Sequence, residues 1–207
     1  MILGMRLETF DSYNLFRDMV DFVVVTPYMN SIIASMCIEE NKPFWVDLST
    51  WDMAWWSEEI INRAEAIVTP TVIGDNYESY ANLIDFQRRY PEQKKHIALH
   101  WGGDKALKKL KEKVWRVGLD WSINRDLEDS KEYHFQGFKT LDELRHYPPA
   151  SLITNMPFYA CYSHIDLPKR ERRPQKLITR IDRDFRDDEI YEIKKNISYI
   201  REAGHGR

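Results

Sequence analysis

The sequence has few cysteines and no long apolar run, and each absence removes a class of protein. Only two cysteines, Cys37 and Cys161, occur among 207 residues. Neither belongs to a CxxC or similar metal-binding spacing, so we expect two reduced thiols rather than a disulfide scaffold. No apolar stretch reaches the roughly 18 residues of a membrane-spanning helix. The start, MILGMRLETF, lacks the pattern of a signal peptide. These absences predict a cytoplasmic protein that makes no membrane contact.

Two kinds of ligand-binding motif are also missing. No GxGxxG or GxxxxGK[ST] segment follows an apolar run, which argues against the common nucleotide-binding open sheets. The six histidines show no HxH or HExxH spacing, so a histidine-based metal site is not expected and no cofactor is predicted. The net charge is −3. A chain-wide attraction for nucleic acid is therefore not expected, and any such contact must be local.

Short apolar runs alternate with segments of helical spacing. Expected strands lie at 20–27, 43–50, 65–70, 95–100, 114–122, 132–138, 150–154 and 176–182. Expected helices lie at 29–41, 51–64, 75–89, 105–113, 139–147 and 187–203. This alternation predicts a parallel sheet. Eight units favour a compact (β/α)8 barrel of α/β class over an open doubly wound sheet. We expect one domain over 1–207, with 167–176 a basic loop and 187–203 a C-terminal helix.

Polar side chains follow the expected strands, at the end where a barrel carries its active site. They include Asp47, Asp75, His100, Trp101, Asp120, Trp121 and Asn155. Carboxylates in one pocket can move protons or recognise the N–H groups of a base, and indoles can stack on a flat ligand. Simpler roles remain open: Asp75 in GDNYE fits a helix cap, as Thr50 does for the helix at 51–64, and His100 fits a structural histidine. Asp47 lies inside its strand, where a cap has no purpose.

Several of these segments resemble the tRNA-guanine transglycosylase-like barrels of the phage type. The resemblance covers about 20–160 and is carried by PFWVDLSTWDMAWW, TPTVIGDNYESYANLIDFQRRYP, HIALHWGGDKALKKL, WRVGLDWS and FQGFKTLDELRHYPPASLITNMPF. It implies that Asp47 is the general acid/base and that Asp75 recognises a guanine-type base. SLITNMPF has no carboxylate where the family has its nucleophile, and the family's zinc-binding cysteines are absent. Asp120 is then the candidate to replace the nucleophile.

A basic segment, LPKRERRPQK at 167–176, bears on the choice of partner. Its cations include Lys169, Arg170, Arg172 and Arg173. We place it in a loop after the strand at 150–154, on the active-site side, where such cations suit the phosphates of DNA or RNA. A solvated charged loop is the simpler interpretation, because Glu171 and two prolines interrupt the run.

Three functions follow from these observations. The leading hypothesis is a barrel that handles a nucleobase or nucleoside, free or within DNA or RNA, by N-glycosidic chemistry. The catalytic residues are then Asp47 and Asp120. A second is a binding protein that has lost the nucleophile. A third is a metal-assisted hydrolase that holds a divalent ion with Asp47, Asp75, His100 and Asp120. The oligomeric state is not predicted.

Overall fold

Eight parallel strands close into a barrel in the order β1 to β8, and β8 pairs back onto β1. The computed structural model describes residues 1–26, 31–49, 57–100, 110–120, 130–163, 165–169, 171–172 and 185–205. The strands are β1 Ile2–Arg6, β2 Phe22–Val25, β3 Phe44–Asp47, β4 Ala66–Val68, β5 His96–His100, β6 Arg116–Asp120, β7 His134–Gln136 and β8 Ser151–Ile153. The predicted α/β barrel is therefore confirmed, and an open sheet is excluded.

The first strand of the barrel was not predicted from the sequence. β1 pairs with both β2 and β8, whereas the first strand expected from the sequence is at 20–27. The expected strand at 176–182 lies outside the described residues. Gly4 interrupts the short β1 run, and glycine weakens a strand pattern. Its presence has a packing reason, because a Cβ at Gly4 would overlap the ring of Phe22.

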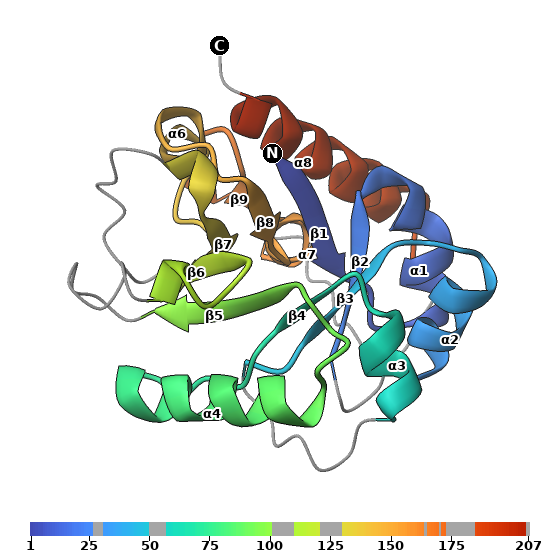
Figure 1. Ribbon diagram of the computed structural model, residues 1–207. Coiled ribbons are helices and arrows are strands. Elements are labelled where there is room, and N and C mark those ends of the chain that lie inside the picture. Colours follow the sequence, from blue (N-terminus) through green and yellow to red (C-terminus); the bar gives the residue numbers. More distant parts are fainter. Residues whose placement is uncertain are drawn as a thin grey trace.

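Helices surround the barrel (Figure 1). Those within the described residues are α1 Phe10–Phe16, α2 Ser31–Glu39, α3 Glu58–Arg63, α4 Asn76–Arg89, α6 Leu141–His146, α7 Met156–Tyr162 and α8 Asp187–His205, with 3-10 turns η1 Arg17–Met19 and η3 Ser130–Glu132. α3 begins after Ser57, whose Oγ accepts a hydrogen bond from the Ile60 N–H at 3.2 Å. Thr50, the expected cap, lies outside the described residues. None of the described helices is long and apolar enough to cross a bilayer.

The C-terminal helix packs on the outside of the barrel beside its first strands. Figure 1 shows α8 on the outside, near β1 and α1. Arg201 of α8 donates to the carbonyl oxygen of Met19 at 2.9 Å and pairs with Asp21 at 3.1 Å. Asp21 in turn accepts from the Leu3 N–H at 2.7 Å. The helix predicted at 187–203 is thus present and is tied to the strand that the sequence did not reveal.

Alternate residues of the strands divide the core into two parts. One set packs between the sheet and the helices, and the other fills the barrel interior. The interior cluster consists of Phe22, Val24, Trp45, Ala66, Val68, Ile97, Leu99 and Ile153. Strands β2 to β5 are buried at every position, as expected for strands that are covered on both faces. The same alternation decides which polar side chains point into the barrel mouth.

Candidate functional site at the barrel mouth

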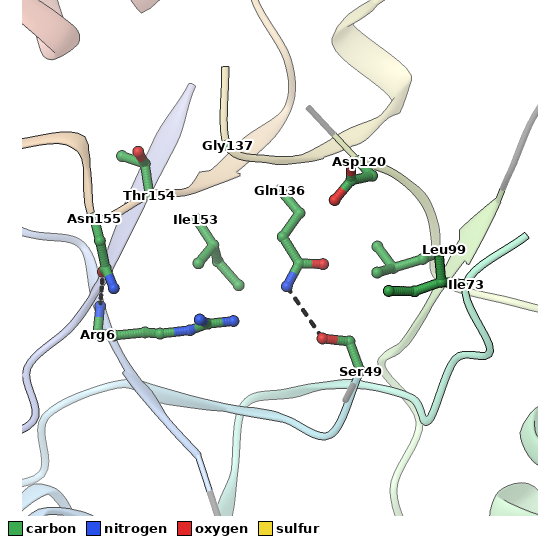
Figure 2. Close-up of a pocket in the computed structure, with 10 residues that line it drawn as sticks. All are labelled: Arg6, Ser49, Ile73, Leu99, Asp120, Gln136, Gly137, Ile153, Thr154 and Asn155. Carbon is green, nitrogen blue, oxygen red and sulfur yellow. Dashed lines mark hydrogen bonds between the residues drawn. The ribbon is translucent and has the colours of Figure 1, made fainter. Parts of the chain in front are cut away.

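A cavity of about 280 Å³ lies at the carboxyl ends of the strands. Its walls come from β1, from β5 to β8, and from the segments that follow β3, β4 and β8 (Figure 2). The lining residues are Arg6, Ser49, Ile73, Leu99, Asp120, Gln136, Gly137, Ile153, Thr154 and Asn155. Enzymes with a (β/α)8 barrel have their active sites at this end of the barrel.

Asp47 does not line the cavity itself but bonds three residues that do, Arg6, Ser49 and Gln136. Its side chain is only 1% exposed. The Oδ2 atom accepts from Arg6 Nη2 at 2.5 Å and from Gln136 Nε2 at 2.9 Å, and Oδ1 accepts from the Ser49 N–H at 3.0 Å. Asp47 thus has the buried partners that an acid inside a strand needs. Because both oxygens are engaged, Asp47 is better placed to orient its neighbours than to transfer a proton.

Arg6 and Gln136 are site residues that the sequence analysis missed. Arg6 ends β1, the strand that was not predicted, and its side chain is 29% exposed. Gln136 ends β7 and also donates to Ser49 Oγ at 3.2 Å. Its Oε1 atom is buried and has no hydrogen-bond partner among the described residues. The only feature of the sequence that could have identified them is their position, since each is the last residue of a strand.

Asp120 and Gln136 lie side by side on neighbouring strands. They are register partners in the β6–β7 pair, and both line the cavity. Figure 2 shows the Gln136 amide oxygen on the side of Asp120 and its nitrogen directed toward Ser49. The cavity therefore presents an amide oxygen next to a half-buried carboxylate. Together these groups form a surface that accepts hydrogen bonds.

Asn155 lies on the opposite side of Figure 2, next to Arg6. Its Oδ1 atom accepts from the Arg6 N–H at 3.3 Å, and it precedes α7 without capping that helix through its side chain. The neighbouring Thr154 Oγ1 accepts from the Met156 N–H at 3.0 Å and thereby holds the start of α7. The structure thus brings Asn155 and Asp120, two of the predicted site residues, to one cavity.

Asp75 lies at the same end of the barrel but does not line this cavity. It is exposed, and its Oδ1 atom accepts from the N–H groups of Tyr77 at 2.9 Å and Glu78 at 3.0 Å. It is therefore the N-cap of α4, the simpler of its two interpretations. The expected arrangement, with Asp47 and Asp75 facing each other across one pocket, is not found among the described contacts.

His100 faces away from the barrel mouth. Its neighbour Leu99 points into the interior, and successive strand residues point to opposite faces. His100 is 2% exposed and lines a separate cavity of about 480 Å³ beside Tyr77 and Tyr80 of α4. The structure therefore does not bring His100 together with Asp47 or Asp120.

Several predicted site residues fall outside the described part of the chain. They are Trp101, Trp121, Arg170 and Arg173, and only the backbone of Arg172 is described. Lys169 is exposed, and its N–H donates to Asp166 Oδ1 at 3.3 Å. A small hairpin of β9 Ile165–Asp166 and β10 Glu171–Arg172 begins only after α7. The basic segment is therefore not the loop that directly follows β8, and its contact with nucleic acid stays a prediction.

The described residues contain no group of three or more His, Cys, Asp or Glu side chains that could hold a metal ion. The four-residue set proposed for a metal-assisted hydrolase is not brought together, because Asp75 caps a helix and His100 points outward. Asp47 is engaged by Arg6, an ion pair that competes with metal coordination.

Comparisons with known proteins add the following. No family model matches the chain, and no curated protein matches it. Among solved structures it is similar to orotidine 5′-phosphate decarboxylase from Thermotoga maritima, with 13% identity over 82% of this chain and 95% of that chain and a TM-score of 0.38. A likeness at this level carries no information about function. The barrel assignment rests on the strand pairing itself.

Proposed function

We propose that the cavity at the barrel mouth binds a nucleobase or nucleoside of the guanine type. The observation that carries this proposal is the pair of acceptors, Asp120 and Gln136 Oε1, on adjacent strands. Of the two, Gln136 Oε1 is a buried acceptor without a donor among the described residues. Such an atom is costly, so we expect a matching ligand to supply an N–H to it. The ring N–H and exocyclic amino group of guanine are two adjacent donors on one edge.

The remaining walls of the cavity suit the faces of a flat ring. Leu99 and Ile153 are buried apolar side chains, and Ile73 is exposed at the mouth. A volume of about 280 Å³ is at the lower end of small-molecule sites, which favours a base or nucleoside over a larger ligand. Asp47 keeps the Gln136 nitrogen occupied, and this contact leaves the amide oxygen for the ligand.

N-glycosidic turnover is the second candidate and is supported by one group. Among the described cavity residues, Asp120 is the sole carboxylate. In such a reaction the bond from C1′ to the base nitrogen breaks, and the base leaves with the electron pair and gains a proton. C1′ then bonds to a carboxylate oxygen or to water. A carboxylate that recognises the base cannot also attack C1′, so base binding without turnover is the function that the geometry supports best.

Calorimetric titration with guanosine, inosine and adenosine tests the proposal. Guanosine offers two donors, inosine one, and adenosine an acceptor at the ring nitrogen, so affinity should fall in that order. Asp120→Asn should weaken guanosine binding about tenfold or more, because a hydrogen bond to a charged group is worth about 1.5–3 kcal/mol. Asp75→Asn, at the same end of the barrel but outside the cavity, is the matched control and should bind like the wild type.

Two outcomes would overturn this function. One is the absence of heat with guanosine at millimolar concentration. The other is equal affinity for guanosine and adenosine, which would show that the acceptor pair does not read the ligand. Incubation of the protein with RNA and a radiolabelled guanine-type base separates binding from turnover: label incorporated into RNA would establish base exchange, and its loss in Asp120→Asn would place the reaction in this cavity.

A further inference from the structure

The opposite end of the barrel interior is filled by stacked rings. Phe22 and Trp45 lie face to face, with ring centroids 3.7 Å apart and planes 16° from parallel. The indole of Trp115 meets Trp45 edge-on at 5.6 Å. Trp45 has no exposed surface, while Trp115 is half-buried at the amino end of β6. The buried ring of His134 lies 5.7 Å from Trp45, so this end is mainly aromatic and holds few polar groups.

Arg116 brings a positive charge into this aromatic end. Residues 116, 118 and 120 of β6 share the inward face, because a Cβ at Gly118 would meet the interior side chain of Leu99 and Asp120 lines the cavity. The Arg116 guanidinium carbon lies 4.0 Å from the centre of the Trp115 ring. Burial lowers the pKa of Arg116 from its ordinary value, yet arginine stays charged at neutral pH.

This charge has no counter-ion in the described part of the chain. The nearest acid by electrostatic influence is Glu65, but Glu65 pairs with Lys95 at 3.1 Å. Lys95 itself lies 5.1 Å from the centre of the Trp115 ring. Lys95 and Arg116 therefore both lie near one indole and share a single nearby carboxylate, which leaves one positive charge in excess.

Two buried donors in this region also have no acceptor. Both Arg116 Nη1 and Trp45 Nε1 are inaccessible to solvent and make no hydrogen bond among the described residues. Both side chains contact the Trp115 ring, so they belong to one cluster. Buried donors are rarely left without a hydrogen-bond partner in native proteins. Two donors and an excess of positive charge around the same ring indicate that an acceptor of negative charge belongs there.

We propose that the amino end of the barrel interior binds a small monovalent anion of the halide class, held by Arg116 and Trp45. A divalent oxyanion would need more donors than two, and its dehydration beside Phe22 and Ile97 would be costly. A weakly hydrated monovalent ion needs few donors and balances the Arg116 charge. The site is independent of the barrel mouth and of the ligand proposed there.

Thermal unfolding in sodium chloride, compared with sodium gluconate at equal ionic strength, tests the site. Gluconate is a bulky organic anion, so a difference between the two salts that depends on Arg116 reports on the small anion. At a chloride concentration ten times its Kd, the wild type should unfold roughly 3–6 °C higher than in gluconate. Arg116→Gln should abolish this difference. Arg88→Gln, which changes an exposed arginine on α4, is the matched control and should keep it.

A second variant and a second measurement keep the test independent of any loss of stability. Trp45→Phe retains an aromatic ring but removes the indole donor, and it should reduce the difference between chloride and gluconate. Crystals grown in sodium bromide should show an anomalous peak within hydrogen-bond distance of Arg116 Nη1. Equal unfolding temperatures in the two salts for the wild type would overturn the proposal, as would a chloride effect that persists in Arg116→Gln or disappears in Arg88→Gln.

Discussion

The two ends of the barrel interior are built from the same strands but differ in chemistry. Trp45 and Asp47 are two residues apart on β3 and point into the same interior, Trp45 into stacked rings and Asp47 into a network with Arg6 and Gln136. In barrels of this kind the carboxyl ends of the strands carry function and the amino ends carry stability. Because every second residue of a strand points inward, one short strand contributes a side chain to each end of the barrel interior.

The largest loss of stability is expected when the hydrogen-bond network of Asp47 is removed. Asp47→Ala leaves the Arg6 guanidinium and the Gln136 amide without their shared acceptor, and we expect a loss of about 2–4 kcal/mol in the free energy of unfolding. Urea denaturation measures it. The double variant Arg6→Met, Asp47→Leu should recover part of this loss, because it leaves no buried charge unpaired. An Asp47→Ala protein within about 0.5 kcal/mol of the wild type would contradict the network as a stabilising element.

The aromatic end should be sensitive to added volume. In Gly4→Ala the new methyl group meets the Phe22 ring, which is held against Trp45. Overpacking of this kind costs about 1–3 kcal/mol. The midpoint of urea unfolding is the measurement, and Phe22→Leu in the same background should restore part of the stability. Unchanged stability of Gly4→Ala would show that the stack is looser than described.

Substitutions of Asp75 distinguish helix capping from ligand binding at the carboxyl ends of the strands. Asp75→Ala should lower the free energy of unfolding by about 1 kcal/mol because α4 loses its N-cap, whereas Asp75→Asn should change it by less, since Asn caps nearly as well. Chemical denaturation of both variants gives the two values. Guanosine affinity should stay at the wild-type level in Asp75→Asn. A clear fall would show instead that Asp75 contacts the ligand, as the family resemblance implies.

The smallest effect concerns pH at the amino end of β5. Burial, followed by the charge of Lys94, lowers the pKa of His96 below its ordinary value. The neutral form is therefore favoured in the folded state, and the unfolded chain binds more protons as the pH falls. Stability should be fully present above the unfolded pKa and decline as the pH falls through the lowered one. Unfolding temperatures at pH 7.5 and 5.5 should differ less in His96→Gln, while exposed His146→Gln should behave like the wild type.

The sequence revealed the strands that are buried on both faces, because an unbroken apolar run such as Phe22–Val25 has few other interpretations. It did not reveal β1, where Gly4 breaks the run for a reason that exists only once the Phe22 ring is packed against it. Asp47 was recognised since an acid at the end of a buried strand needs an explanation. Arg6 and Gln136 were missed because their importance comes from contacts across 41 and 89 residues of sequence.

By itself the sequence determined the alternation of strands and helices, and hence a parallel barrel, because these patterns depend on local spacing and burial. It also determined that Asp75 can cap α4, a contact within three residues. Tertiary structure alone decided which polar side chains meet. Barrel closure brings β1 beside β8 and sets Asp120 next to Gln136, whereas strand alternation turns His100 outward. Register is a property of paired strands, and no single segment of the chain contains it.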